Sequence, residues 1–154
     1  LDIMLLLCGP VKEVHGMVHT SSFHQLEAED FSGALLNFES GARGTLMAST
    51  THFPGHKEEI ILNCSEATVN ISGADLKVFY HNGKIESLET DSQTGSGSDP
   101  MDFSYTWHAN VIEQFWTQFT KNQQIEISAE SALPVQQLID AIVRSSKLEK
   151  KVTV

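Results

Sequence analysis

The stretch DFSGALLNFESGARGTLMASTT, residues 30–51, decides the fold of this chain. We expect Asp30 to Phe38 and Arg43 to Thr51 to be strands, joined by the turn Glu39-Ser40-Gly41-Ala42. Leu36 and Phe38 then face one side, and Leu46 and Ala48 alternate in the return strand. The stretch therefore predicts an antiparallel hairpin.

Upstream of the hairpin, the sequence predicts a short helix and a strand. Asp2 to Cys8 is apolar, Gly9 suits a left-handed helix cap, and Pro10 ends the helix. Val11 to Thr20 has the composition of a strand. The chain begins with Leu1 inside this helix and has no signal-peptide pattern, so we expect it to be truncated upstream.

Downstream of the hairpin, short strand-like segments predict an antiparallel meander, with Asn82-Gly83 as a type I′ turn. The expected strands are Glu58 to Cys64, Thr68 to Ile71, Leu76 to Tyr80 and Ile85 to Leu88. The polar stretch from Asp91 to Pro100 is expected to be a mobile surface loop.

From Ser104 onward the apolar residues recur at helical spacing. One helix is expected to bury an aromatic stripe, with Trp116 in the core; the stripe comprises Val111, Ile112, Phe115, Trp116 and Phe119. A second helix is capped at Ser128 or Ser131 with Pro134 in its first turn, and its core face carries Leu138, Ile139, Ile142 and Val143. Lys151 to Val154 is expected to return to the sheet as an edge strand.

Strands followed by helices indicate an α+β fold, a largely antiparallel open-faced sheet with helices packed on one face. The opposite face would be too apolar for water, so we expect it to be an assembly surface. We found no internal repeat, heptad run, glycine-rich phosphate loop, Ser-His-Asp motif or nucleophile elbow. The motifs alone therefore indicate no reaction.

Composition limits the classes of function. The 154 residues fit one domain, and the hydrophobic share of 40% and charged share of 19% are those of a globular protein. No apolar run reaches the roughly 20 residues that span a bilayer. A net charge of −10 with scattered basic residues argues against nucleic-acid binding.

Cysteine and histidine indicate no disulfide framework and no metal. Cys8 and Cys64 are isolated, which favours a reducing cytoplasm. His15 and His19 lie four residues apart in an expected strand, where about 13 Å would separate them. They cannot share one ion, and we expect no metal site.

The order of several short motifs resembles the C-terminal domain of the Gfo/Idh/MocA oxidoreductases over nearly the whole chain. The matching pieces are Leu1-Asp2-Ile3-Met4, Gly9-Pro10-Val11, Glu29-Asp30, Gly41 with Gly44, Phe53-Pro54-Gly55, His108 with Ile112 and Phe115, Ser145-Ser146, and Val152-Thr153-Val154. Two turns differ from the family pattern, at Cys64-Ser65-Glu66-Ala67 and near Leu148, where the family has glycine.

The resemblance implies a two-domain dehydrogenase that acts on a sugar, sugar derivative or cyclitol hydroxyl. Its NAD or NADP would be held by an N-terminal Rossmann domain, which we expect to be absent from this chain. The family's catalytic Lys and His would fall before Leu1, so no catalytic or cofactor-binding residue is expected within it. This domain would form one wall of the substrate pocket and the homo-oligomer interface.

Four residues are candidates for substrate binding through the resemblance. Asp2 would accept a hydrogen bond from a substrate hydroxyl or orient the neighbouring His, or it only complements the helix dipole. His108 would point toward the sugar, or it is a first-turn histidine bonded to a backbone carbonyl. His52 and Phe53 would line the pocket, or they only pack the loop.

Other polar and aromatic residues have simpler interpretations. Trp107 and Trp116 suit stacking on a sugar, but Trp116 fits the core better. Glu29 and Asp30 are interpreted as a solvated pair that opens a strand. The alternative to an enzyme half is a noncatalytic oligomerisation or binding module. In either case we expect residues 1–154 alone to have no dehydrogenase activity.

Overall fold

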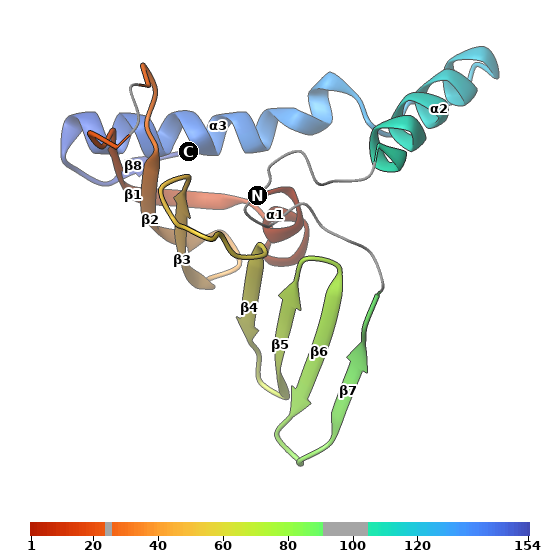
Figure 1. Ribbon diagram of the computed structural model, residues 1–154, viewed down its shortest axis with the longest axis horizontal. Helices are drawn as coiled ribbons and strands as arrows, with labels where there is room; N and C mark the ends of the chain where they lie inside the picture. Colours follow the sequence, from red (N-terminus) through yellow and green to blue (C-terminus); the bar gives the residue numbers. More distant parts are fainter. Residues whose placement is uncertain (24–25, 91–104) are drawn as a thin grey trace. The chain divides into compact units, whose positions relative to one another are not determined.

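The computed structural model describes residues 1–23, 26–90 and 105–154. Its elements (Figure 1) are α1 (Asp2–Cys8), β1 (Val11–His19), β2 (Phe31–Phe38), β3 (Arg43–Ser49), β4 (Glu59–Asn63), β5 (Ala67–Ser72), β6 (Asp75–Tyr80), β7 (Ile85–Leu88), α2 (Thr106–Thr120), α3 (Ala129–Leu148) and β8 (Val152–Thr153). They form two compact units. The first comprises Leu1–Thr51 with Val111–Val154, and the second comprises His52–Asn110.

The first unit contains a four-stranded sheet in the order β3-β2-β1-β8. β2 and β3 pair antiparallel from Phe31 opposite Ser49 to Asn37 opposite Arg43, which confirms the predicted hairpin. β8 pairs with β1 through Glu13 opposite Thr153 and Val14 opposite Val152. The last strand therefore lies at the sheet edge, as predicted.

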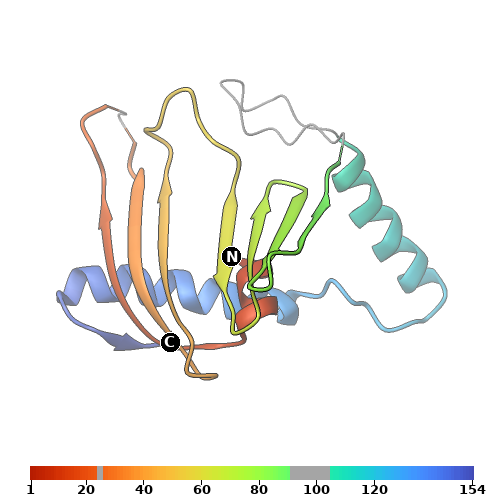
Figure 2. The same ribbon diagram turned by 90° about the horizontal axis from the view of Figure 1, so that it is seen from below.

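The core of the first unit lies between this sheet and α3, which crosses one face of it (Figure 2). Leu36, Leu138 and Val14 are its largest fully buried apolar side chains. Gly16 allows the close approach, because a Cβ atom there would lie 2.7 Å from the carbonyl oxygen of Ile142. Met4, Leu5 and Cys8 of α1 also pack against this core.

Two serines of α3 complete the hydrogen bonding of β1 beyond the short β8. The Gly16 N–H donates to Ser145 Oγ at 2.9 Å, and the Val18 N–H donates to Ser146 Oγ at 3.0 Å. The Ser145 hydroxyl in turn donates to the Lys150 carbonyl at 2.5 Å. Buried backbone N–H groups need such partners, so the Ser145-Ser146 pair fixes the helix to the strand.

The ends of the helices differ in detail from the predictions. Ser128 caps α3, and its side chain accepts from the Ser131 N–H. Pro134 is therefore the sixth residue of α3, in its second turn, and its predicted first-turn place is wrong. Gly9 has φ 81° but ψ −171°, so it is not a left-handed helical cap; the chain turns directly into β1. At the end of α3, Glu149 takes the left-handed conformation instead.

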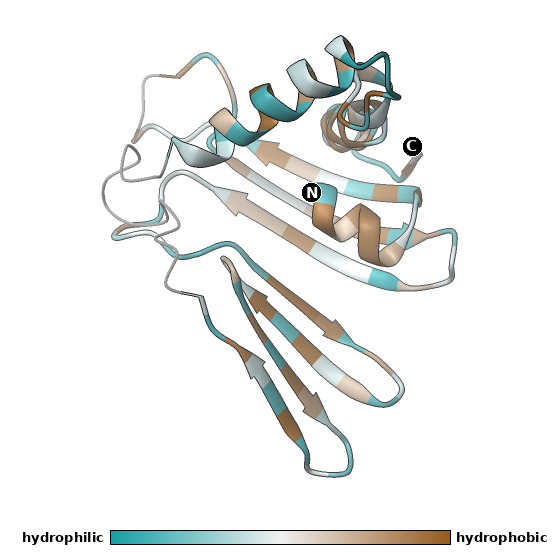
Figure 3. Ribbon diagram, turned by 90° about the vertical axis from the view of Figure 1, so that its right-hand side faces the viewer, coloured by the Kyte–Doolittle hydropathy of each residue, from teal (hydrophilic) through white to brown (hydrophobic). Residues whose placement is uncertain are grey.

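The second unit contains the predicted meander, a four-stranded antiparallel sheet in the order β4-β5-β6-β7. Its hairpin turn at Asn82-Gly83 is confirmed, but the turn is not type I′, since only Gly83 has a positive φ, at 88°. The Tyr80 N–H donates to the Lys84 carbonyl at 2.9 Å, which closes a three-residue loop with glycine in the left-handed position. Hydrophobic and hydrophilic residues alternate along the strands (Figure 3).

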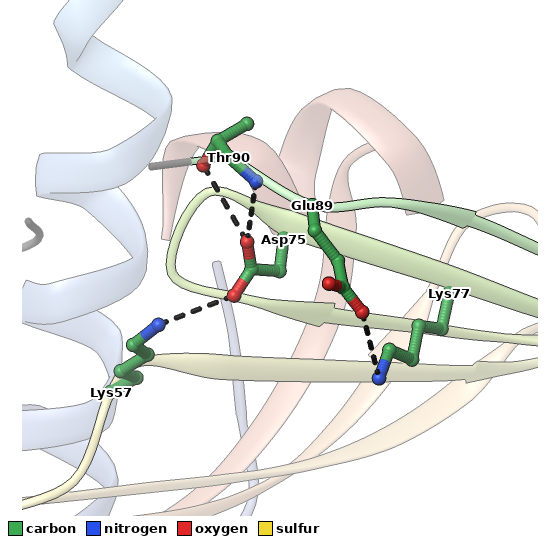
Figure 4. Close-up of polar contacts among 5 residues, drawn as sticks. All are labelled: Lys57, Asp75, Lys77, Glu89 and Thr90. Atoms are coloured by element: carbon green, nitrogen blue, oxygen red, sulfur yellow. Dashed lines mark hydrogen bonds and ion pairs between the residues drawn. The ribbon is translucent and has the colours of Figure 1, made fainter. Parts of the chain in front are cut away.

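An acidic residue ties the ends of this meander together (Figure 4). Asp75 accepts from the Thr90 N–H at 2.9 Å and from Lys57 Nζ at 3.2 Å. The Thr90 N–H, followed by the Lys57 ammonium, holds the pKa of the Asp75 carboxyl below its usual value. Lys57 precedes β4 and Thr90 follows β7, so Asp75 connects the two edges of the sheet through the β5–β6 turn.

The aromatic stripe of α2 is exposed, so the prediction that this helix buries it is wrong. None of the fifteen residues of α2 is buried, and Trp116, which we expected in the core, is 62% exposed. Phe119 instead stacks on Phe115 and lies tilted against Trp116 along the helix, at ring-centroid distances of 6.1 and 6.4 Å. Periodicity identified the helix correctly, but it does not identify what covers the apolar side.

The α+β class is confirmed, with antiparallel strands and helices packed on one face of the first sheet. The strands form two sheets of four. Two further expectations lie outside the described residues: the loop from Asp91 to Pro100 and the start of the helical pattern at Ser104.

Candidate functional site

Asp2 lies in the first turn of the seven-residue helix α1 and is exposed. The helix begins with the Leu5 N–H donating to the Leu1 carbonyl at 3.0 Å. An exposed carboxylate at a helix N-terminus is free to meet a hydroxyl group and also complements the helix dipole. The position of Asp2 is therefore compatible with both of its predicted roles.

His52 and Phe53 lie in the segment between β3 and β4, and both are exposed. Phe53 is 84% exposed, which leaves its ring face open to a ligand. The His52 ring lies against the ring of His56, with 4.3 Å between the ring centroids and 38° between the planes. His56 is not among the predicted site residues, although its spacing of four from His52 across the Pro54-Gly55 turn is visible in the sequence.

His108 lies in the first turn of α2, next to Trp107, and is exposed. His52, Phe53 and His108 belong to the second unit, whereas Asp2 belongs to the first. Among the described residues of these segments, the His52 and His56 rings lie in contact. Both residues carry imidazole groups, which can donate and accept hydrogen bonds and can bind metal ions.

Asp30 is buried, so its interpretation as a solvated strand-opening residue is wrong. It is only 2% exposed, and its carboxylate accepts from the Ser21 N–H at 2.8 Å and the Ser21 hydroxyl at 2.5 Å. Its backbone carbonyl accepts from the Thr50 N–H at 3.0 Å. Asp30 therefore organises the loop end of the first sheet, while Glu29 is exposed.

The face of the first sheet opposite α3 exposes large apolar side chains. Met17, Leu35 and Met47 are 59%, 60% and 78% exposed. Met17 and Met47 lie opposite Gly33 from its two sides, and Leu35 lies opposite His15 and Thr45. Because side chains two residues apart share a face, these residues form one surface, which we call the open face.

The described residues contain no group of three or more His, Cys, Asp or Glu side chains close enough to hold a metal ion. None of their helices has the length and apolar character needed to cross a membrane.

A family comparison agrees with the order of motifs in the sequence. Residues 1–70 match the GFO/IDH/MocA C-terminal domain. The predicted resemblance to this domain is thereby confirmed. The matched region includes α1, the hairpin and the segment with His52 and His56, and so three of the four candidate residues. A comparison with curated proteins gave no match.

Solved structures resemble the whole chain in fold. A levoglucosan dehydrogenase in complex with NADH and levoglucosan is 18% identical with a TM-score of 0.76, and 99% of this chain covers 47% of that one. The aldose-aldose oxidoreductase from Caulobacter crescentus with glycerol is 16% identical with a TM-score of 0.75, and the match covers 99% of this chain and 44% of that one. The WlbA dehydrogenase from Bordetella pertussis with NADH and UDP-GlcNAcA is 19% identical with a TM-score of 0.72, and the match covers 99% of this chain and 41% of that one. This chain thus spans less than half the length of each.

Proposed function

We propose that this chain is the substrate-binding and oligomerisation domain of an NAD- or NADP-dependent oxidoreductase. The enzyme would act on a hydroxyl group of a sugar, a sugar derivative or a cyclitol. The observation that carries the proposal is the match of residues 1–70 to the GFO/IDH/MocA C-terminal domain. The fold likeness over 99% of the chain to a levoglucosan dehydrogenase with levoglucosan and to an aldose-aldose oxidoreductase with glycerol supports it.

The described residues do not fit a dinucleotide site of their own. A Rossmann site needs parallel strands joined by helices, with a glycine-rich turn at the start of a helix. The strand pairs found in the described parts of the chain are all antiparallel. The cofactor therefore belongs to an N-terminal Rossmann domain of a longer protein, together with the catalytic Lys and His.

The exposed side of α1 supports a neighbouring domain. Ile3, Leu6 and Leu7 are exposed, and Leu6 is 82% exposed, while the other side of this helix packs into the core. Apolar side chains gathered on one short helix favour a protein contact over water. In a two-domain enzyme this side of α1 would pack against the Rossmann domain and place Asp2 beside the cofactor.

The substrate-binding roles follow from the chemistry of the four candidate residues. The Asp2 carboxylate accepts hydrogen bonds from hydroxyl groups, and His52 and His108 donate or accept them. The exposed ring of Phe53 offers an apolar surface to the C–H face of a sugar ring. Proton transfer is assigned to residues that precede Leu1, and hydride transfer is the chemistry that a bound nicotinamide supplies.

The test of this proposal is cofactor reduction by the full-length protein and by residues 1–154 in parallel. We expect the full-length protein to reduce NAD or NADP with a member of a sugar and cyclitol panel, and the 154-residue chain to be inactive. An Asp2→Asn substitution in the full-length protein should raise KM for the substrate without changing cofactor binding. Cofactor reduction by residues 1–154 alone would contradict the assignment.

A noncatalytic oligomerisation module is the second candidate, favoured by the open face with Met17, Leu35 and Met47. Such a protein would assemble through this face and bind no nucleotide. Titration of the full-length protein with NAD and NADP separates the two candidates. The free thiols of Cys8 and Cys64 agree with a reducing cytoplasm for either one.

A further inference from the structure

The contact between His52 and His56 brings two nitrogen ligands together on the surface of the second unit. The centroids of the two rings are 4.3 Å apart, and both side chains are exposed to solvent. An imidazole nitrogen binds a zinc-like ion at about 2.0–2.1 Å. Two rings with centres about 4–5 Å apart can therefore both reach one ion through small side-chain rotations.

The local backbone is what produces this arrangement. The segment turns at Gly55, which has φ 91°, so residues four apart in sequence come face to face. The pair His15 and His19 has the same spacing but lies in β1, where roughly 13 Å separates such residues. The chain thus contains two pairs with equal spacing, and only the pair in the turn has its rings in contact.

The charges near the His52–His56 pair are compatible with a cation. Lys57 follows His56 directly, but its ammonium group forms an ion pair with Asp75 at 3.2 Å (Figure 4). This pairing offsets the charge that would otherwise repel an incoming ion. Glu58 and Glu59 follow in the sequence, and the chain as a whole carries a net charge of −10.

We propose that His52 and His56 form a two-histidine site for a late first-row divalent metal ion, Cu²⁺, Ni²⁺ or Zn²⁺. Imidazole suits these ions, whereas Mg²⁺ and Ca²⁺ require oxygen ligands. Water fills the remaining coordination positions, because no third protein ligand lies within reach among the described residues. The affinity order follows the general series, with Cu²⁺ bound more tightly than Ni²⁺ or Zn²⁺. This site goes beyond the proposed function and needs no nucleotide cofactor; it shares His52 with the proposed substrate-binding residues.

The experiment is calorimetric titration of the 154-residue chain with NiCl₂ and, separately, with MgCl₂. We expect saturable binding of one Ni²⁺ per chain and no binding of Mg²⁺. Replacement of either ligand, His52→Ala or His56→Ala, should weaken Ni²⁺ binding by more than about tenfold, since loss of a ligand exceeds loss of a supporting contact. Circular dichroism and urea unfolding of each variant show whether its fold is kept.

The matched control is the double variant His15→Ala/His19→Ala, which removes the same number of histidines at the same spacing. It should bind Ni²⁺ like the unchanged chain. A second measurement follows the histidine proton signals by NMR, where paramagnetic Ni²⁺ should broaden those of His52 and His56 first. Binding that persists in His52→Ala/His56→Ala, that is lost in the control variant, or that never saturates would overturn the proposal.

Discussion

Single residues of the first unit set the distance between its helix and its sheet. Gly16 and Ser145 both lie where α3 meets β1, and Ser145 is fully buried. The sequence does not reveal this role, because a glycine in a strand or a serine in a helix does not by itself indicate a close contact. Their significance comes from the partner that packs against them.

Gly16→Ala should destabilise the chain strongly. The new Cβ atom would lie 2.7 Å from the Ile142 carbonyl oxygen, which belongs to the backbone of α3 and cannot rotate away. We expect a loss of about 1–3 kcal/mol in the free energy of unfolding, measured by urea denaturation. Gly33→Ala is the control, because its Cβ would meet its nearest atoms at an ordinary 3.5 Å. Equal losses in the two variants would disprove the close-approach argument.

Glu149→Gly should stabilise the chain. Glu149 ends α3 with φ 52° and ψ 35°, a conformation that costs most residues about 1–2 kcal/mol and glycine almost nothing. Glycine also gives the unfolded chain more backbone freedom, which offsets part of this benefit. We therefore expect a net gain of about 0.5–1 kcal/mol in the free energy of unfolding. Glu149→Ala removes the same carboxylate but keeps the Cβ atom, so it should give no gain. The melting temperatures of the three proteins test this directly.

At the scale of elements, hydrogen bonds and ion pairs join neighbours that the chain separates. β1 receives hydrogen bonds from α3 and pairs with β8, and both elements lie more than a hundred residues later in the sequence. The sequence predicted all three elements and the edge position of the last strand. It did not predict their contacts, because propensity and periodicity describe each segment alone.

Ser145→Ala should weaken the union of α3 with β1. The substitution leaves the Gly16 N–H without its acceptor and the Lys150 carbonyl without its donor, at a buried position. An unsatisfied buried donor costs about 1–3 kcal/mol, and the Lys150 carbonyl is only partly buried, so we expect a loss of about 1–3 kcal/mol by urea denaturation. Ser146→Ala, which affects the less buried Val18 N–H, should cost less. The reverse order of the two losses would contradict this account.

The stability contributed by the Glu13–Lys151 ion pair, beside the pairing of β1 with β8, should depend on pH. Glu13 accepts from Lys151 Nζ at 2.9 Å, and this bond is the main cause that lowers the pKa of Glu13 below 4.5. A carboxyl with a lowered folded-state pKa contributes stability above pH 4.5, and that contribution is lost as pH falls through the lowered value. Glu13→Gln should therefore reduce stability slightly at pH 7, and this loss should diminish as the pH falls below 4.5, as measured by urea midpoints. Lys151→Gln should show the same pattern, and a constant difference across pH would refute it.

For the whole molecule, the open face is the feature with the largest consequence. Three exposed apolar side chains on one sheet surface favour self-association, since closed symmetry removes such a surface from water. The prediction of an apolar uncovered face came from the strand pattern. The residues that form it required the register of β1, β2 and β3.

Met47→Lys should shift the chain toward monomer, as measured by sedimentation velocity over a range of concentrations. Met47 is 78% exposed on the open face, and a lysine there would place two like charges across a symmetric contact. Ile61→Lys, at a 54% exposed apolar position of the second unit, is the control and should leave the association unchanged. A strictly monomeric unsubstituted chain would rule out this interface.

The candidate site shows the same division between sequence and structure. Asp2, His52, Phe53 and His108 were named from motif order, and the structure places each of them at an exposed position. The contact between His52 and His56 was not predicted. The only histidine spacing considered was that of His15 and His19 on a strand, whereas His52 and His56 lie on a turn. Asp30 was misjudged because its partner, Ser21, lies nine residues earlier, in a different segment.

The sequence by itself determined the elements, the antiparallel hairpin, the α+β class and the family resemblance. These depend on local backbone preference and on alternation or helical spacing, which each segment carries within itself. Only the tertiary structure decided that Asp30 is buried, that Trp116 is exposed and that Gly16 lies against Ile142. The physical reason is that burial and contact belong to pairs of segments, and a partner far away in the chain leaves no mark on the local pattern.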